Sequence, residues 1–194
     1  MLRWGLFFVL LAGSAVSWSQ PWSVGLDVAV TQLDDAGYAR AVSSAKLDSD
    51  HDNGGQFSLG YQLRPWLQAE LSLGRLGRYD TQTSSGLRMD IKTVDTAAVW
   101  SLPVAARQQL LLTTGLAVMR YEQVLRSVSG GRIRSSDDVY SPLLGIGWRY
   151  FPASGHNKAS ISLSLDYREL DVESGSRNFS MGLTRAGLAY HYFF

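Results

Sequence analysis

The feature of this sequence that most constrains its fold is an alternation of apolar and polar side chains, which recurs from Trp22 to Phe194. The stretch "ASISLSLDYR" shows it most clearly, with Ile161, Leu163 and Leu165 on one face and serines on the other. Successive side chains of a β-strand point to opposite faces, so period two is strand periodicity. The chain is therefore predicted to be all-β.

Eight segments carry this pattern. All are 9–11 residues long, the length that a tilted strand needs to cross a bilayer. In chain order they are "SVGLDVAVTQL", "GQFSLGYQL", "WLQAELSLG", "KTVDTAAVWSL", "QLLLTTGLAVM", "YSPLLGIGWRY", "ASISLSLDYR" and "TRAGLAYHYFF".

The connections between the segments alternate in length. Three short links each carry a proline, which suits a turn and cannot donate to a strand ladder: Pro65, Pro103 and Pro152. The other links are expected to be long polar loops, at residues 34–54, 77–88, 122–137 and 170–178. This arrangement predicts an up-and-down antiparallel sheet whose two ends differ.

Alternation alone fits a soluble barrel with an apolar interior and a membrane barrel with the reverse arrangement. The polar face favours the membrane barrel, because it consists mainly of Gly, Ala and Ser, which fit a narrow interior. A soluble exterior would carry many Lys and Glu instead.

The charges on this face are expected to pair inside the barrel, because unpaired burial costs several kcal/mol each. They are Asp27, Glu70, Asp95, Asp166, Arg149, Arg168 and Arg185. The alternative is that they are surface charges of a soluble barrel.

Aromatic residues gather near the segment ends, as in the girdles at membrane interfaces. We expect one group at the short-turn end and one at the long-loop end: Trp66, Trp100, Trp148, Tyr150 and Tyr192, then Tyr79, Tyr121, Tyr140 and Tyr167. An open sheet edge is not tolerated in lipid, so the sheet must close. The predicted fold is an eight-stranded antiparallel up-and-down transmembrane β-barrel.

The N-terminus has the pattern of a secretory signal peptide: Arg3, then a short apolar run, then small residues. We assign residues 1–19 to it, with cleavage after Ser17 or Ser19, and residues 20–194 to the barrel.

Removing Arg3 leaves seventeen basic and seventeen acidic residues, and this balance argues against a nucleic-acid partner. The sequence has no cysteine, so no disulfide stabilises the exported chain.

Two stretches carry a resemblance to a known family. They are "LGYQLRPWLQAELSLG", in which a Gly-Tyr strand turns at Pro-Trp into a strand holding Glu70, and the terminal "RAGLAYHYFF". The chain resembles the small outer-membrane β-barrel superfamily, which contains the OmpA transmembrane domain and OmpX. The resemblance implies a location in the outer membrane and contact with its lipid and lipopolysaccharide. It also implies that the barrel-assembly machinery recognises Arg185, Gly187, Tyr190, Tyr192 and Phe194, although Phe193 and Phe194 extend the usual pattern by two residues.

Catalytic and metal sites have weaker support. The acids Asp48, Asp50 and Asp52 match the start of a calcium-binding EF-hand loop, but Asn53 replaces its glycine and Leu59 its glutamate. Some similar barrels are lipid A deacylases or acyltransferases of the PagL and PagP types. No histidine here begins the His-x-Ser pair of the deacylase, and only His51 could serve the acyltransferase pattern.

We therefore expect a monomeric structural or surface-interaction barrel that is not an enzyme and has no cofactor or metal. Its long loops are expected to contact an external ligand that the sequence does not identify. The alternatives are a lipid A-modifying enzyme and a small passive pore.

Overall fold

The eight predicted strands close into a single ring. The computed structural model describes residues 21–35, 37–43, 46–81, 86–126, 131–152, 158–174 and 177–194. Each strand pairs antiparallel with its neighbour in the sequence, and β1 pairs with β8. The strands are β1 (Trp22–Asp34), β2 (His51–Arg64), β3 (Leu67–Asp80), β4 (Leu87–Ala105), β5 (Gln108–Arg126), β6 (Arg132–Tyr150), β7 (Ala159–Ser174) and β8 (Arg177–Phe193), and a short helix, α2 (Tyr38–Ser43), follows β1. The predicted fold class is confirmed.

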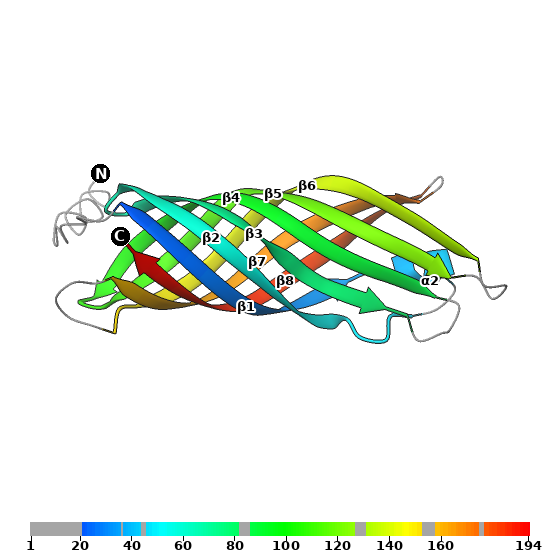
Figure 1. Cartoon of the computed structure of the whole chain (residues 1–194), viewed down its shortest axis with the longest axis horizontal. Helices are drawn as coiled ribbons and strands as arrows, with labels where there is room; N and C mark the ends of the chain where they lie inside the picture. The colour runs from blue at the N-terminus through cyan, green and yellow to red at the C-terminus, as the bar shows by residue number, and fades with distance from the viewer. Residues whose placement is uncertain are drawn as a thin grey trace, which may run out of the picture.

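The ring closes beside the two chain ends. The N–H of Phe194 donates to the carbonyl of Trp22 at 2.9 Å, and the N–H of Trp22 donates back at 3.2 Å. Figure 1 shows the start of β1 and the C-terminus at one end of the barrel and α2 at the other. We call these the turn end and the loop end. In the described part of the chain, no helix is long and apolar enough to cross a membrane.

The outer wall of the turn-end part is apolar, as the alternation predicts. Leu26, Leu163 and Ile146 are each more than half exposed, and they belong to a continuous band of exposed apolar side chains. Aromatic rings flank this band at the turn end, where Trp66 stacks on Trp100 and Trp148 stacks on Tyr150. A surface of this kind is stable against lipid rather than water.

The links differ from the prediction in two respects. The turn after β2 contains Pro65 as expected, but Pro103 lies within β4, beside a register shift that ends at Ala105. The expected long loops at 122–137 and 170–178 are mostly strand, because β5 to β8 continue past the apolar band, whereas most of the expected loop at 34–54 lies outside the strands. Pro152 lies in the link between β6 and β7, of which residues 153–157 lie outside the described residues. Residues 1–19, which we expect to form a signal peptide, also lie outside them.

The interior changes character along the barrel axis. In the loop-end part it is filled by an apolar cluster, which we call the apolar plug: Leu33, Tyr38, Ala39, Leu76, Tyr79, Leu87, Met89, Ile91, Ala117, Met119, Tyr121, Leu170, Val172, Met181 and Leu183. Helix α2 contributes two of these residues, and the Asp35 carboxylate caps it by accepting the Ala39 N–H at 3.1 Å. The expectation of a polar interior therefore holds only for the part inside the apolar band.

Two tyrosines expected in the loop-end girdle lie inside the barrel instead. Tyr79 and Tyr121 are 1% and 3% exposed, whereas Tyr140 and Tyr167 face outward as expected. On β3 the cause is a register shift between Arg75 and Gly77, which moves the following odd-numbered residues to the interior. On β5 the alternation simply continues from the inward Ala117, so Tyr121 shares its face.

Candidate functional site

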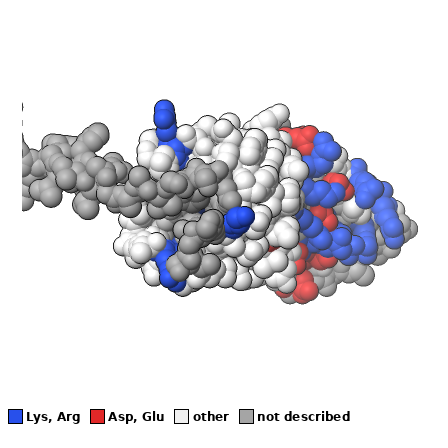
Figure 2. All heavy atoms as spheres, turned by 60° about the vertical axis from the view of Figure 1, so that its left-hand side comes forward, with Lys and Arg blue, Asp and Glu red and all other residues white. Residues whose placement is uncertain are grey.

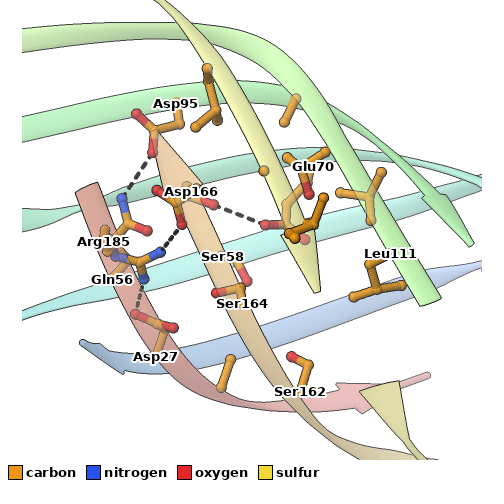
Figure 3. A pocket seen from close by; sticks show the side chains of 18 of the residues that line it. Asp27, Gln56, Ser58, Glu70, Asp95, Leu111, Ser162, Ser164, Asp166 and Arg185 are labelled. Atoms are coloured by element: carbon orange, nitrogen blue, oxygen red, sulfur yellow. Dashed lines mark hydrogen bonds and ion pairs between the residues drawn. The ribbon is translucent and has the colours of Figure 1, made fainter. Parts of the chain in front are cut away.

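Five of the seven predicted interior charges form one connected group, which we call the ion-pair network: Asp27, Asp95, Asp166, Arg168 and Arg185. Arg168 bonds to Asp95 at 2.5 Å and also to Asp166, while Arg185 bonds to Asp166 at 2.7 Å and also to Asp27. Figure 3 shows Arg185 between Asp27 and Asp166. These residues come from β1, β4, β7 and β8, so the network ties together strands far apart in the sequence.

The remaining two predicted charges lie apart from this network. Glu70 accepts hydrogen bonds from Gln68 at 3.2 Å and Ser72 at 3.1 Å. Arg149 is buried, its guanidinium lies 5.7 Å from the ring centre of Phe193, and it attracts Glu70 electrostatically. A cation over an aromatic face is a favourable contact.

Phe193 has an interior role that the sequence reasoning left open. Its ring is 2% exposed and lies 5.9 Å from that of Phe151, centre to centre. It therefore helps to fill the interior at the turn end, whereas its neighbour Phe194 faces outward. The alternation through Tyr190 and Tyr192 was sufficient to place both residues.

A cavity of about 90 Å³ lies beside the ion-pair network and is lined by residues such as Ser58, Ser162 and His191 (Figure 3). A polar cavity of this size has room for a few water molecules. The apolar plug fills the interior between this cavity and the loop end. Both features leave little room for an open channel.

The candidate catalytic and calcium-binding residues do not form a site. His51 is exposed and its ring bonds to the Asp50 carboxylate, while the Ser49 hydroxyl bonds to the backbone of His51 rather than to its ring. The Asp52 carboxylate accepts the backbone N–H of Arg78. Among the described residues, no three His, Asp or Glu side chains are grouped to hold a metal ion.

The residues of the predicted assembly signal lie on β8 and, for Phe194, directly after it, and they point in two directions. Tyr190, Tyr192 and Phe194 face outward at the turn end. Gly187 faces the interior, where an added Cβ would lie 2.6 Å from an Asp27 oxygen. The glycine therefore leaves space for the ion pair between Asp27 and Arg185.

At the loop end, the outer wall of β3 to β6 is charged instead of apolar. We call this surface the charged wall; it comprises Arg75–Asp80, Leu87–Lys92, Arg120–Arg126 and Arg132–Asp138, with eight basic and five acidic residues. Figure 2 shows it as a belt of blue and red beyond a white, uncharged body. Sequence reasoning assigned much of these segments, at residues 77–88 and 122–137, to loops and so missed the wall.

Most charges of the wall are paired across neighbouring strands. Arg120 bonds to both oxygens of Asp138, at 2.7 and 2.8 Å, and Lys92 bonds to Glu122 at 3.0 Å. These bonds favour the ionised carboxyl groups and lower the pKa of Asp138 and of Glu122.

One pair of facing positions in the charged wall carries two positive charges instead of an ion pair. Arg126 and Arg132 are direct Cα partners on β5 and β6, and both are exposed. Among the described residues, neither has an acidic partner within ion-pair distance. Like charges opposite one another on neighbouring strands destabilise a sheet unless something neutralises them. This spot is therefore suited to an anion.

Comparisons with known proteins agree with this architecture. Several solved structures share the fold, and three of them illustrate the likeness. Neisserial surface protein A has a TM-score of 0.62 and 12% identity over 89% of this chain and 97% of its own. Ail, the attachment invasion locus protein of Yersinia pestis, was solved in complex with the heparin analogue sucrose octasulfate. It has a TM-score of 0.54 and 18% identity over 89% of this chain and 99% of its own. OprG from Pseudomonas aeruginosa has a TM-score of 0.54 and 12% identity over 91% of this chain and 96% of its own.

The comparison with curated proteins found no match. The family model of the outer membrane protein beta-barrel domain, however, matches residues 5–192, which is nearly the whole chain. Together with the closed ring and its apolar band, this match places the protein in the outer membrane, in contact with lipid and lipopolysaccharide. The chain belongs to the outer membrane protein beta-barrel domain family.

Proposed function

We propose that this protein is a non-conducting surface-interaction barrel, whose loop end faces the outside of the cell and binds polyanionic glycans. The observation that carries the proposal is the exposed pair Arg126 and Arg132, which lie opposite one another without an acidic partner among the described residues. Sulfate and phosphate groups bind arginine through charge-assisted hydrogen bonds. The similar barrel Ail was solved with a heparin analogue, which is a ligand of this chemistry.

The interior supports a binding role over a pore. An ion must pass both the ion-pair network and the apolar plug to cross the barrel. Recording in planar bilayers is expected to give no unitary current, with a porin as the positive control. Regular conductance steps from the pure protein would favour the alternative of a small passive pore.

The glycan is tested with purified barrel in lipid nanodiscs and an immobilised sulfated oligosaccharide. Replacing both Arg126 and Arg132 by Gln is expected to weaken binding at least about tenfold and to reduce its salt dependence. The matched control replaces Arg64 and Arg107, which are exposed at the turn end. Equal losses in the two double variants would reject the loop-end site.

We also propose that the barrel is a monomer within its own membrane and has no catalytic role. The terminal residues Tyr190, Tyr192 and Phe194 are proposed to direct the chain to the assembly machinery. Deleting Phe193 and Phe194 should lower the amount of protein in the outer membrane, and unchanged levels would contradict this role.

A further inference from the structure

The sheet formed by β3 to β6 has an uncovered edge at the loop end. β6 pairs with β5 along its whole length, from Arg132 to Tyr150, but its pairing with β7 stops at Leu143. Pro142 lies where this pairing stops, and proline has no N–H to give to a ladder. The Ser141 hydroxyl accepts the N–H of Glu169 at 2.8 Å and so makes a last link between the strands. We call the segment Arg132–Pro142 the β6 edge.

The opposite edge of the same sheet is covered. The segment before β2 lies along the end of β3, where the N–H of Asp48 donates to the Asp80 carbonyl at 2.8 Å and Leu47 pairs with Thr81. Within the described part of the chain, no strand pairs with the β6 edge, and every residue from 132 to 138 is exposed. An exposed strand edge is a template for another strand.

The sequence of the β6 edge is self-complementary. It reads "RIRSSDDVY" from Arg132 to Tyr140, with Ser136 at its centre. If two copies align antiparallel with Ser136 opposite itself, the basic first half meets the acidic second half. The resulting cross-strand pairs are Arg134 with Asp138, Ser135 with Asp137, Ile133 with Val139, and Arg132 with Tyr140. Ionic, polar, aliphatic and cation–aromatic pairs of these kinds each stabilise a sheet.

We propose that the β6 edge pairs antiparallel with the β6 edge of a second copy of this chain, about a two-fold axis at Ser136. Asp138 keeps its bond to Arg120, because a carboxylate accepts up to about four hydrogen bonds. The two-fold arrangement closes on itself and so forms a dimer rather than a fibre.

The antiparallel direction determines how the two barrels meet. Two copies in one membrane have β6 running the same way, and in-register parallel pairing sets Arg134 beside Arg134 and Asp138 beside Asp138, which is unfavourable. Antiparallel pairing brings two loop ends head to head, so in cells it joins barrels of two facing membranes. This inference rests on the proposed orientation, with the loop end outside. Nine paired residues span about 30 Å, which makes a small, reversible contact.

Cysteine cross-linking tests the register, since the chain has no cysteine of its own. Purified Ser136→Cys protein in detergent micelles is oxidised and the covalent dimer is measured on gels. The expected yield is at least about tenfold above that of Ser135→Cys, because position 135 lies opposite Asp137. Comparable yields at positions 135 and 136 would indicate parallel pairing or random collision and would overturn the proposal. Ser180→Cys on β8 is the control for random collision, and a Ser136→Cys yield no higher than its yield would also overturn the proposal.

Charge reversal in the Ser136→Cys background provides the second test. Arg134→Asp alone and Asp138→Arg alone should each lose the cross-link, because each homodimer then opposes like charges. A mixture of the two should restore it, since both pairs then join opposite charges. Heat-modifiable gel migration verifies that each variant is folded, and a mixture that stays monomeric would overturn the register. Retained glycan binding by such a protein would leave the proposed function intact.

Discussion

Removing Arg185 should destabilise the barrel more than removing Asp166, the carboxylate that bridges the two arginines of the ion-pair network. Among the described residues, Arg185 is the only cation that bonds to Asp27, whose side chain is 12% exposed. The variant Arg185→Met keeps much of the volume but leaves this carboxylate buried and unpaired. Removing one partner of a buried ion pair costs about 3–5 kcal/mol. The unfolding equilibrium constant is therefore expected to rise by roughly two to four orders of magnitude.

A second variant separates this cause from a general loss of packing. In Asp166→Asn each arginine keeps one carboxylate, because Arg168 still bonds to Asp95 and Arg185 to Asp27. The cost should then be close to that of one hydrogen bond to a charged group, about 1.5–3 kcal/mol. The removal of a cation should thus cost more than the removal of the carboxylate that bridges the two cations.

The measurement is urea unfolding of the refolded barrel in phospholipid vesicles, followed by tryptophan fluorescence. The double variant Asp27→Asn with Arg185→Met should be more stable than Arg185→Met alone, since it no longer buries an unpaired charge. A loss below about 1 kcal/mol for Arg185→Met would refute the reasoning. The reasoning would also be refuted if the two losses were simply additive. In that case the double variant would be less stable than Arg185→Met by the full cost that Asp27→Asn has on its own.

Three further outcomes are expected. Phe193→Ala should cost about 3–5 kcal/mol in the same titration, because it empties an interior position, and a cost below about 1 kcal/mol would contradict this packing role. Gly187→Val should destabilise the barrel by crowding Asp27, and Gly187→Val in an Asp27→Ala background should cost less; equal costs would exclude the steric explanation. Because the pKa of Asp138 is lowered in the folded barrel, its bond to Arg120 contributes fully above the usual carboxyl range and is lost as the pH falls through the lowered value. Hydrogen exchange of the backbone amides at the loop end of β5, corrected for intrinsic rates, should therefore be faster at pH 3 than at pH 7. The Arg120→Gln variant lacks the bond at both pH values, so its corrected rate should already be fast at pH 7.

The part of the fold inside the apolar band could be predicted from the sequence almost completely. Leu163 faces lipid and Asp166 faces the interior because alternation continues without interruption along β7. Five of the seven buried charges pair with one another, as the cost of unpaired burial leads one to expect, whereas Glu70 bonds to Gln68 and Ser72. The specific pairs did not follow, because the stagger between strands, and not the sequence, decides that Asp95 meets Arg168.

The register shift in β3 was not predictable in the same way. One additional residue between Arg75 and Gly77 reverses the faces of the residues that follow, and it leaves no clear signal in the sequence. Tyr79 therefore points inward although its number has the parity of the outward Leu73. The open β6 edge was missed for a related reason, since pairing between strands depends on where neighbouring strands diverge.

The loop-end part was mistaken for loops because the faces of the alternation exchange at the edge of the membrane. Apolar residues face outward inside the apolar band and inward beyond it. Along β4 the outward face changes from Val94 to Lys92, and at the same level the inward face changes from Asp95 and Thr93 to Ile91 and Met89. Inside the band the wall meets lipid, so its outer face is apolar and its narrow interior holds polar groups. Beyond the band the same wall meets water, so the charged residues lie outside and the apolar residues form a core. The alternation along β4 and its register with β5 continue unchanged across this level, and only the solvent differs. The stretch "DIKTVD", Asp90 to Asp95, therefore marks the membrane boundary within a single strand.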